Sequence, residues 1–237
     1  MANIEAIAFD AYGTLFDFTE PDFIVAFAEI CADQRLDADA ADLWRRFLAA
    51  AFKFRSENHH DPIYTRYDEA WARQFEYVFR RLKLPGDPWA ASHHLRERLA
   101  TADAFAEVRP VLDALHSRYR LAVLSNSDDD FLHAALKRND LDFDVVVTSE
   151  QAGAIKPNPA IFHHLAARLG LEPARILYVG DNPIPDVLGP RNAGMRVAWV
   201  VRTPQRRPSK VPPPDLRVRT LSELVPRLVP QDARIPA

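Results

Sequence analysis

The chain has 237 residues, of which 48% are hydrophobic, so it is long enough for one large domain or for a core with a smaller addition. A net charge of −3 argues against a general nucleic-acid binder, and we expect no nucleic-acid partner. A single cysteine excludes a disulfide framework and favours a reducing, cytoplasmic setting, while the lack of a long apolar run or a signal-like N-terminus predicts no membrane association.

The predicted elements fall into two blocks. A short apolar run over residues 4–9 predicts a buried strand. Residues 17–103 then show helical periodicity without strong strand signals, which predicts helices over 21–33, 38–55, 64–82 and 88–100. From residue 107 onward strands and helices alternate. Strands are predicted over 121–124, 145–147, 176–179 and 197–201, and helices over 129–137, 159–169, 185–193 and 221–228, followed by a frayed tail.

The second block is typical of a parallel sheet with crossover helices, and the strand over 4–9 belongs with it. The first block therefore predicts a helical insertion into an α/β domain, which leaves after the first strand and returns near residue 105. The proline-rich segment 204–214 is expected to be a stiff, solvated surface loop.

Polar residues gather where the predicted strands end. In a parallel sheet these ends meet at one edge, where ligands bind. Each residue alone has an ordinary explanation, such as a turn, a surface lysine or a helix cap. Together they predict a crevice with a carboxylate nucleophile, neutral donors, a cation and further acids, suited to an anionic substrate or to displacement at an electrophilic centre. The residues are Asp10, Tyr12, Thr14, Ser125, Asn126, Lys156, Asp181, Asn182 and Asp186.

The order and spacing of these motifs resemble the haloacid dehalogenase (HAD) superfamily, with the helical insertion at the position of its C1-type cap. The resemblance implies an α/β fold with a doubly wound parallel-sheet (Rossmann-like) core over 1–16 and 104–237, and an inserted α-helical cap domain over 17–103. It also implies a covalent intermediate on Asp10, with Thr14, Ser125 and Lys156 as further catalytic residues that hold the transferring anion.

Two features point to the dehalogenase branch of that superfamily. Phosphatases of the family carry a second Asp two residues after the nucleophile as the general acid and base, and this chain has Tyr12 there. A phenol is a poor base at neutral pH, but a halide leaves without needing a proton. Arg45 lies where dehalogenases carry an arginine that holds the halide or the substrate carboxylate.

Asp181 points the other way. Dehalogenases replace this acid by a small neutral residue and need no metal. Two facing carboxylates would raise each other's pKa values unless a cation lies between them, and Mg²⁺ is the natural hard ion for such oxygen ligands. The resemblance then implies a metal site formed by Asp10, the backbone carbonyl of Tyr12, Asp181 and Asp186.

We weigh the metal argument above the Tyr12 argument and expect a Mg²⁺-dependent phosphatase of small phosphate esters. The first alternative is a metal-free L-2-haloacid dehalogenase, and the second is a catalytically weakened binding or regulatory protein. Tyr12, Arg45, Asn126 and Asn182 are the predicted substrate-binding residues. The expected partner is a small anionic substrate, and the sequence leaves monomer and homodimer open.

Overall fold

The structure is a computed structural model that describes residues 3–57 and 64–229, so most of the predicted frayed tail, residues 230–237, lies outside it. The described chain forms a six-stranded sheet with strand order β3-β2-β1-β4-β5-β6, and all neighbouring strands run parallel. The strands are β1 (Ala6–Phe9), β2 (Arg120–Ser125), β3 (Val145–Thr148), β4 (Ile176–Gly180), β5 (Arg196–Val200) and β6 (Leu216–Val218).

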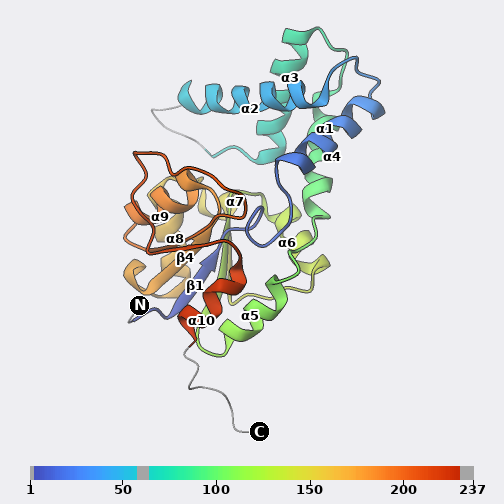
Figure 1. Ribbon diagram of the computed structural model, residues 1–237. Helices are drawn as coiled ribbons and strands as arrows, with labels where there is room; N and C mark the ends of the chain where they lie inside the picture. The colour runs from blue at the N-terminus through green and yellow to red at the C-terminus, as the bar shows by residue number, and fades with distance from the viewer. Residues whose placement is uncertain (1–2, 58–63, 230–237) are drawn as a thin grey trace.

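Helices cover both faces of this sheet (Figure 1). In β1 the side chains of Ile7 and Phe9 pack with α5 (Val108–His116), α6 (Asp129–Arg138) and α10 (Val225–Leu228). Ala6 and Ala8 point to the opposite face and pack with α8 (Pro159–Leu169). A strand buried on both faces reads as a continuous apolar run, which is why residues 4–9 carry no polar alternation. The predicted α/β class is confirmed.

The strand order reverses between β1 and β4. The chain passes from β1 through β2 to β3 on one side, then returns to β4, β5 and β6 on the other. Residues just beyond β1 and β4 therefore flank the point where ligands bind in open α/β sheets. Asp10 follows β1 and Asp181 follows β4, so the topology brings both carboxylates to this point.

A group of helices lies beyond the carboxyl edge of the sheet (Figure 1). It comprises α1 (Glu20–Asp33), α2 (Ala40–Glu57), α3 (Tyr67–Leu82) and α4 (Pro88–Ala100), close to the predicted ranges. Its interior is aromatic, with the Phe27 ring 5.3 Å from those of Phe47 and Phe75. An isolated bridge between Phe16 and Ala104 joins the segments that enter and leave the group. The division into two domains at these positions stays a prediction.

Several elements differ from the prediction. The helix α5 was not predicted, although its buried Val108, Val111, Leu112 and Leu115 follow helical spacing. The strand β6 was not predicted because three residues are too few to show a period. The predicted helix over 185–193 starts earlier, as a π-helical turn η2 (Pro183–Leu188) followed by α9 (Gly189–Asn192). The final helix begins with a 3₁₀ turn before α10.

The proline-rich segment is more closely packed than expected. Val211 is fully buried and belongs to an apolar cluster with Val197 and Trp199 of β5. The side-chain amide of Gln205 donates a hydrogen bond to the backbone carbonyl of Asp181 at 3.3 Å. The expectation of a solvated loop is therefore wrong for Val211, whereas Gln205 and its neighbours are exposed as expected. Among the described residues, no helix has the length and apolar character needed to cross a membrane.

One buried carboxylate ties the helices α1 to α4, named the cap below, to the sheet and the helices that cover it, named the sheet domain below. Asp128, shortly after β2, is fully buried and accepts hydrogen bonds from the backbone N–H groups of Tyr67 (2.9 Å) and Asp68 (3.4 Å). It also accepts one from the Tyr64 hydroxyl at 2.6 Å. Orphan N–H groups at a helix N-terminus are normally satisfied by a local side chain, and here a residue of the sheet domain caps α3.

Replacing Asp128 by Ala should destabilise the protein by about 1–3 kcal/mol, because it leaves buried donors at the start of α3 without an acceptor. Chemical denaturation of the two proteins measures this difference. The matched control is Asp130→Ala, which removes a carboxylate that is 52% exposed two residues further on. We expect a smaller loss for it, and equal losses for the two variants would contradict a special role for Asp128.

Candidate active site

The structure brings the predicted strand-end residues together at the switch point. The backbone N–H of Asp10 donates to the carbonyl of Val179 in β4 at 2.8 Å, which continues the sheet to the carboxylate. Ser125 ends β2 and is buried, and Thr14 is fully buried one turn after Asp10. The Thr14 hydroxyl lies 3.4 Å from Asp10 Oδ2 and 3.5 Å from Asp181 Oδ1.

Lys156 is the central cation of this cluster. Its Nζ lies 2.5 Å from Asp10 Oδ1 and 2.7 Å from Asp186 Oδ1, and its side chain is 2% exposed. The ammonium also lies 2.9 Å from the buried hydroxyl of Tyr178. Buried charges persist only when paired and hydrogen-bonded, and Lys156 meets this condition on three sides. The cation that the sequence predicts for this crevice thus lies directly beside Asp10.

Asp181 approaches Asp10 because Gly13 has no side chain. Gly13 has a φ of +86°, a conformation that favours glycine, and a Cβ there would lie 2.7 Å from Asp181 Oδ2. Gly180 plays the same part for Asp186, whose Cβ occupies the space that a side chain at Gly180 would need. Because these two glycines have no side chains, the carboxylates of Asp181 and Asp186 can both lie near Asp10.

Burial and mutual repulsion shift the protonation of these acids. Burial raises the pKa of Asp10 to about 6, although Lys156 opposes the shift. Burial, with the like charges of Asp186 and Asp10, raises the pKa of Asp181 to about 8. The pKa of Lys156 lies well above its usual value, because Asp10 and Asp186 outweigh the opposite effect of burial. Protonation of Asp181, or a further cation beside it, would relieve this repulsion.

The carboxylates fit a divalent cation. Asp10, Asp181 and Asp186 each offer an oxygen, and these oxygens lie within 4.8 Å of one another. Mg²⁺ prefers such oxygen ligands, usually one or two carboxylates with water and substrate phosphate. A bound ion would neutralise the charge that raises the pKa of Asp181. The residues present are thus compatible with the metal site expected from the sequence.

The raised pKa of Asp181 predicts a pH dependence of stability. An acid whose pKa is higher in the folded state contributes stability below its unfolded value, near 3.8, and loses it as the pH rises through about 8. We expect the free energy of unfolding of the metal-free protein to fall over this window and Asp181→Asn to flatten the profile. Urea denaturation at pH 5 and at pH 8.5 tests this, with Asp17→Asn, an exposed acid, as the control. Parallel profiles for wild type and Asp181→Asn would contradict it.

Tyr12 forms part of an aromatic wall. Its hydroxyl donates to the backbone carbonyl of Leu99 in the cap at 3.3 Å. Its ring packs with those of Phe16, Phe18 and Phe131, at centroid distances of 5.4, 6.3 and 6.1 Å. Burial, together with nearby Asp10, raises the pKa of Tyr12 well above that of a free phenol. Tyr12 therefore cannot act as a base at neutral pH, as its residue type predicts.

Two of the predicted substrate-binding residues have protein partners. Asn126 exchanges two hydrogen bonds with the backbone of Lys156, from Lys156 N to Oδ1 (2.7 Å) and from Nδ2 to Lys156 O (3.2 Å). Asn182 caps η2 by accepting from the N–H of Ile184 at 3.3 Å. These contacts place the cation and the turn that carries Asp186, and the predicted contacts with substrate stay predictions.

Arg45 is the predicted site residue that the structure does not bring to the cluster. It lies on the exposed side of α2, where its guanidinium pairs with Asp42 at 3.2 Å and donates to the carbonyl of Ala41. Its side chain is 68% exposed. A role at the substrate requires this local pair to break.

Sequence reasoning missed supporting residues on β4, on β5 and just after β5. Tyr178 looks like an ordinary core residue, yet its hydroxyl meets Lys156 and donates to the Leu124 carbonyl at 3.1 Å. Trp199 Nε1 donates to the carbonyl of Asp181 at 2.8 Å. Arg202 contacts the turn after Asp10. For Tyr178 and Trp199, the signal in the sequence was a side chain with a polar atom inside an apolar strand, because such a buried atom needs a hydrogen-bond partner.

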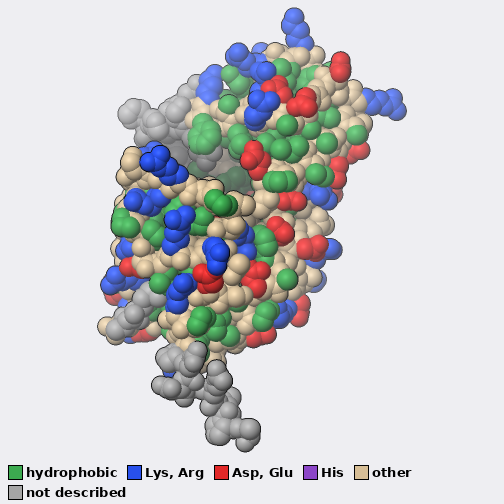
Figure 2. All heavy atoms as spheres, in the orientation of Figure 1, with side chains coloured by type: hydrophobic (Ala, Val, Ile, Leu, Met, Phe, Trp, Pro, Cys, Tyr) green, Lys and Arg blue, Asp and Glu red, His purple; other side chains and the backbone are tan. Residues whose placement is uncertain are grey.

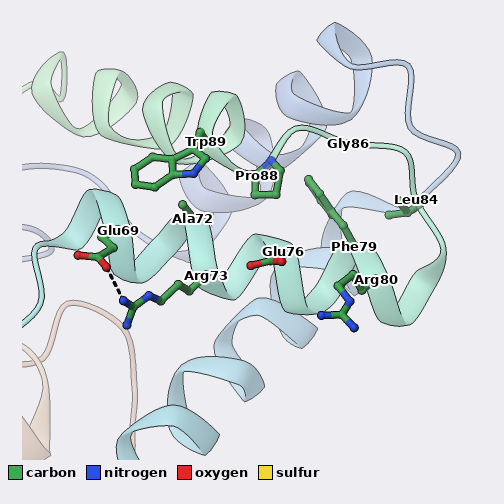
Figure 3. A pocket seen from close by; sticks show the side chains of 10 residues that line it. All are labelled: Glu69, Ala72, Arg73, Glu76, Phe79, Arg80, Leu84, Gly86, Pro88 and Trp89. Atoms are coloured by element: carbon green, nitrogen blue, oxygen red, sulfur yellow. Dashed lines mark hydrogen bonds and ion pairs between the residues drawn. The ribbon is translucent and has the colours of Figure 1, made fainter.

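The surface is hollowed between the cap helices and the sheet domain, with charges of both signs on either part (Figure 2). A separate groove of about 600 Å³ lies on the cap, between α3 and the start of α4 (Figure 3). Phe79 and Trp89 form its apolar side, and Glu69 and Arg73 form an ion pair at its rim. Its lining includes none of the strand-end residues, so the switch point remains the candidate site.

Comparisons with known proteins agree with this geometry. A family model described as haloacid dehalogenase-like hydrolase matches residues 4–194. Haloacetate dehalogenase H-2 from Moraxella sp. (strain B) is 31% identical over 207 residues, which cover 85% of this chain and 88% of that protein. A phosphoserine phosphatase from Thermus thermophilus is 34% identical over 164 residues, covering 65% of this chain and 66% of that protein. A solved dehalogenase structure with an intermediate complex matches with a TM-score of 0.78 and 25% identity, covering 96% of this chain and 98% of that one.

The chain belongs to the haloacid dehalogenase-like hydrolases. It is therefore a hydrolase, which favours the enzyme readings over a purely binding or regulatory protein. The relatives include both dehalogenases and phosphatases, but the dehalogenases named above cover more of the chain. The comparisons thus favour the dehalogenase alternative over the phosphatase predicted from the sequence.

Proposed function

We propose that this enzyme cleaves the carbon–halogen bond of small 2-haloacids. The observation that carries the proposal is Tyr12, which occupies the position of the phosphatase general acid and base. Its hydroxyl is engaged with Leu99 and its ring with neighbouring aromatic rings. A halide leaves without a proton, so the reaction does not need the missing acid, whereas an alcohol leaving group does.

In the proposed reaction, Asp10 attacks the carbon that bears the halogen. The new bond between Asp10 and that carbon forms as the carbon–halogen bond breaks, and the halide departs with the bonding electrons. The Nζ of Lys156 contacts Asp10 Oδ1 and so holds the carboxylate by the oxygen that does not attack. Water then attacks the carbonyl carbon of the aspartyl ester and releases a 2-hydroxyacid. Asp186, held by Lys156 and by the backbone N–H of Asn182 (3.0 Å), is the neighbouring carboxylate that can take the proton of the water.

Hydrolysis of small phosphate esters is the second candidate, and the group of three carboxylates favours it. With Mg²⁺ bound, Asp10, Asp181 and Asp186 would hold the ion, which would neutralise a phosphate and orient it. A general acid or base contributes about 10²–10⁴-fold, so a phosphatase with Tyr12 would be slow.

A parallel assay separates the two candidates. Wild-type protein is incubated with haloacetate and both enantiomers of 2-chloropropionate, and with a panel of phosphate esters, each with Mg²⁺ and with chelator. Halide release that survives chelation supports the dehalogenase. Phosphate release that requires Mg²⁺, without halide release, would overturn the dehalogenase and leave the phosphatase. Asp17→Asn, which alters an exposed acid outside the cluster, controls for preparation effects.

A further inference from the structure

Arg202, just beyond the end of β5, reaches the turn that follows the nucleophile. Its Nε donates to the carbonyl of Gly13 at 3.2 Å, and one terminal nitrogen donates to the carbonyl of Thr14 at 2.9 Å. The side chain is 18% exposed. A planar guanidinium presents its donors in a fixed fork, so two consecutive carbonyls bound by one fork have little freedom to rotate.

The guanidinium is itself held in place. Its other terminal nitrogen lies 2.6 Å from the carboxylate of Glu107, which is 20% exposed. Its carbon lies 3.4 Å from the centroid of the Phe105 ring. Both partners lie where the chain re-enters the sheet domain from the cap. Although burial acts to raise it, the pKa of Glu107 is lowered by the bond from Arg202, which agrees with a persistent ion pair.

The turn that Arg202 contacts is closed around a single carbonyl. The backbone N–H groups of Thr14, Leu15 and Phe16 all donate to the carbonyl of Ala11, at 3.2, 2.7 and 2.9 Å. The carbonyls of Gly13 and Thr14 therefore lie on the outside of the turn, where Arg202 meets them. A change in the turn would move the Thr14 hydroxyl relative to Asp10.

We propose that Arg202 is a positioning residue, which holds the turn from Ala11 to Phe16 so that Asp10 and Thr14 keep their reactive geometry. The inference rests on the proposed function only in taking Asp10 as the nucleophile. The end of β5 and the segment after it also contact the turn after β4, because Trp199 and Gln205 both donate to the carbonyl of Asp181. The segment 199–205 thus links the two halves of the site.

The test compares Arg202→Met, Arg202→Lys and the control Arg196→Met. Arg196 lies at the opposite end of β5, where it is 55% exposed and pairs with Asp215. We expect Arg202→Met to lower kcat by about 10- to 100-fold, as for a misplaced reacting group, with KM within about threefold of wild type. Arg202→Lys should recover part of kcat, because an ammonium can still meet one carbonyl. Arg196→Met should keep the wild-type kcat.

Amide hydrogen exchange gives a readout that needs no substrate. In Arg202→Met we expect the amides of Thr14, Leu15 and Phe16 to exchange about tenfold faster or more, and in Arg196→Met at the wild-type rate. Loss of thermal stability with unchanged kcat and unchanged exchange in this turn would overturn the inference. If wild type releases no halide, the proposed dehalogenase fails instead. The kcat comparison then uses whichever phosphate ester is turned over, while the exchange comparison stands unaltered.

Discussion

Replacing Asp10 by Asn should lower kcat by at least about 10⁴-fold, because the amide cannot form the covalent intermediate. The fold should persist, since Asn has nearly the same shape and Lys156 keeps its contact with Asp186 at 2.7 Å. The measurement is kcat on the substrate identified by the panel, with circular dichroism to verify the fold. The control is Asp17→Asn, an exposed acid on the same segment, which should retain activity. Substantial turnover by Asp10→Asn would contradict a nucleophilic role.

A single turnover in water labelled with heavy oxygen distinguishes the two reactions that Asp10 could carry out. In a dehalogenase, water attacks the carbonyl carbon of the aspartyl ester, so one labelled oxygen remains on Asp10 when the 2-hydroxyacid departs. In a phosphatase, water attacks phosphorus, so the label leaves with phosphate and Asp10 stays unlabelled. Mass spectrometry of the peptide that contains Asp10 therefore identifies the electrophile. Label on another carboxylate, with none on Asp10 or phosphate, would contradict both mechanisms.

The sequence predicts that Asp10, Lys156 and Asp186 lie at the same edge of the sheet, although not which of them form pairs. Each follows or precedes an element of a strand–helix alternation, and a parallel sheet places such positions at one edge whatever the details of packing. The strands themselves could be predicted because a strand buried on both faces has a continuous run of apolar residues. The structure adds that Lys156 bridges Asp10 and Asp186, a geometry that depends on the length of the loop before α8.

The supporting contacts could not be predicted because they are non-local. Arg202 lies 188 residues from Thr14 along the chain, and only the adjacency of strands brings them together. Tyr178 and Trp199 are hidden within apolar strands, where a phenol or indole resembles any core residue. Asp128 had the appearance of a polar turn residue, and its role in capping α3 depends on how the cap packs. Arg45 shows the converse, since its residue type suited the site but its helix face pairs it with Asp42.

The choice of reaction illustrates a different difficulty. Tyr12 favours the dehalogenases and Asp181 favours the phosphatases. Which of the two counts for more depends on whether the cations already in the site neutralise its carboxylates. Lys156 contacts the carboxylates of Asp10 and Asp186. Neither of these ion pairs includes Asp181. Burial and the like charges of Asp186 and Asp10 raise the pKa of Asp181 to about 8, and either a proton on Asp181 or a bound cation would relieve this repulsion. Both branches are therefore compatible with the three carboxylates, and the assay with and without chelator decides between them.

Replacing Lys156 by Met should abolish turnover and also destabilise the fold by about 3–5 kcal/mol near pH 8, because it strands two buried carboxylates without their cation. The matched control is Lys137→Met on α6, an exposed lysine whose loss should change stability by no more than about 0.5 kcal/mol. Urea denaturation measures both. The loss should shrink at low pH, since protonation of Asp10, whose pKa is raised by burial to about 6, removes one of the two charges that Lys156 neutralises in the wild type.

The double variant Lys156→Met with Asp186→Asn separates charge from packing. If the stranded charge causes the instability, removing one of the two carboxylates should recover part of the lost stability at pH 8 while activity stays absent, because the nucleophile still lacks its cation. If the instability instead reflects lost packing of the lysine stem, the second substitution should bring no recovery. A single Lys156→Met variant as stable as wild type at pH 8 would contradict the expected role of Lys156 as the cation that neutralises both carboxylates through its contacts of 2.5 and 2.7 Å.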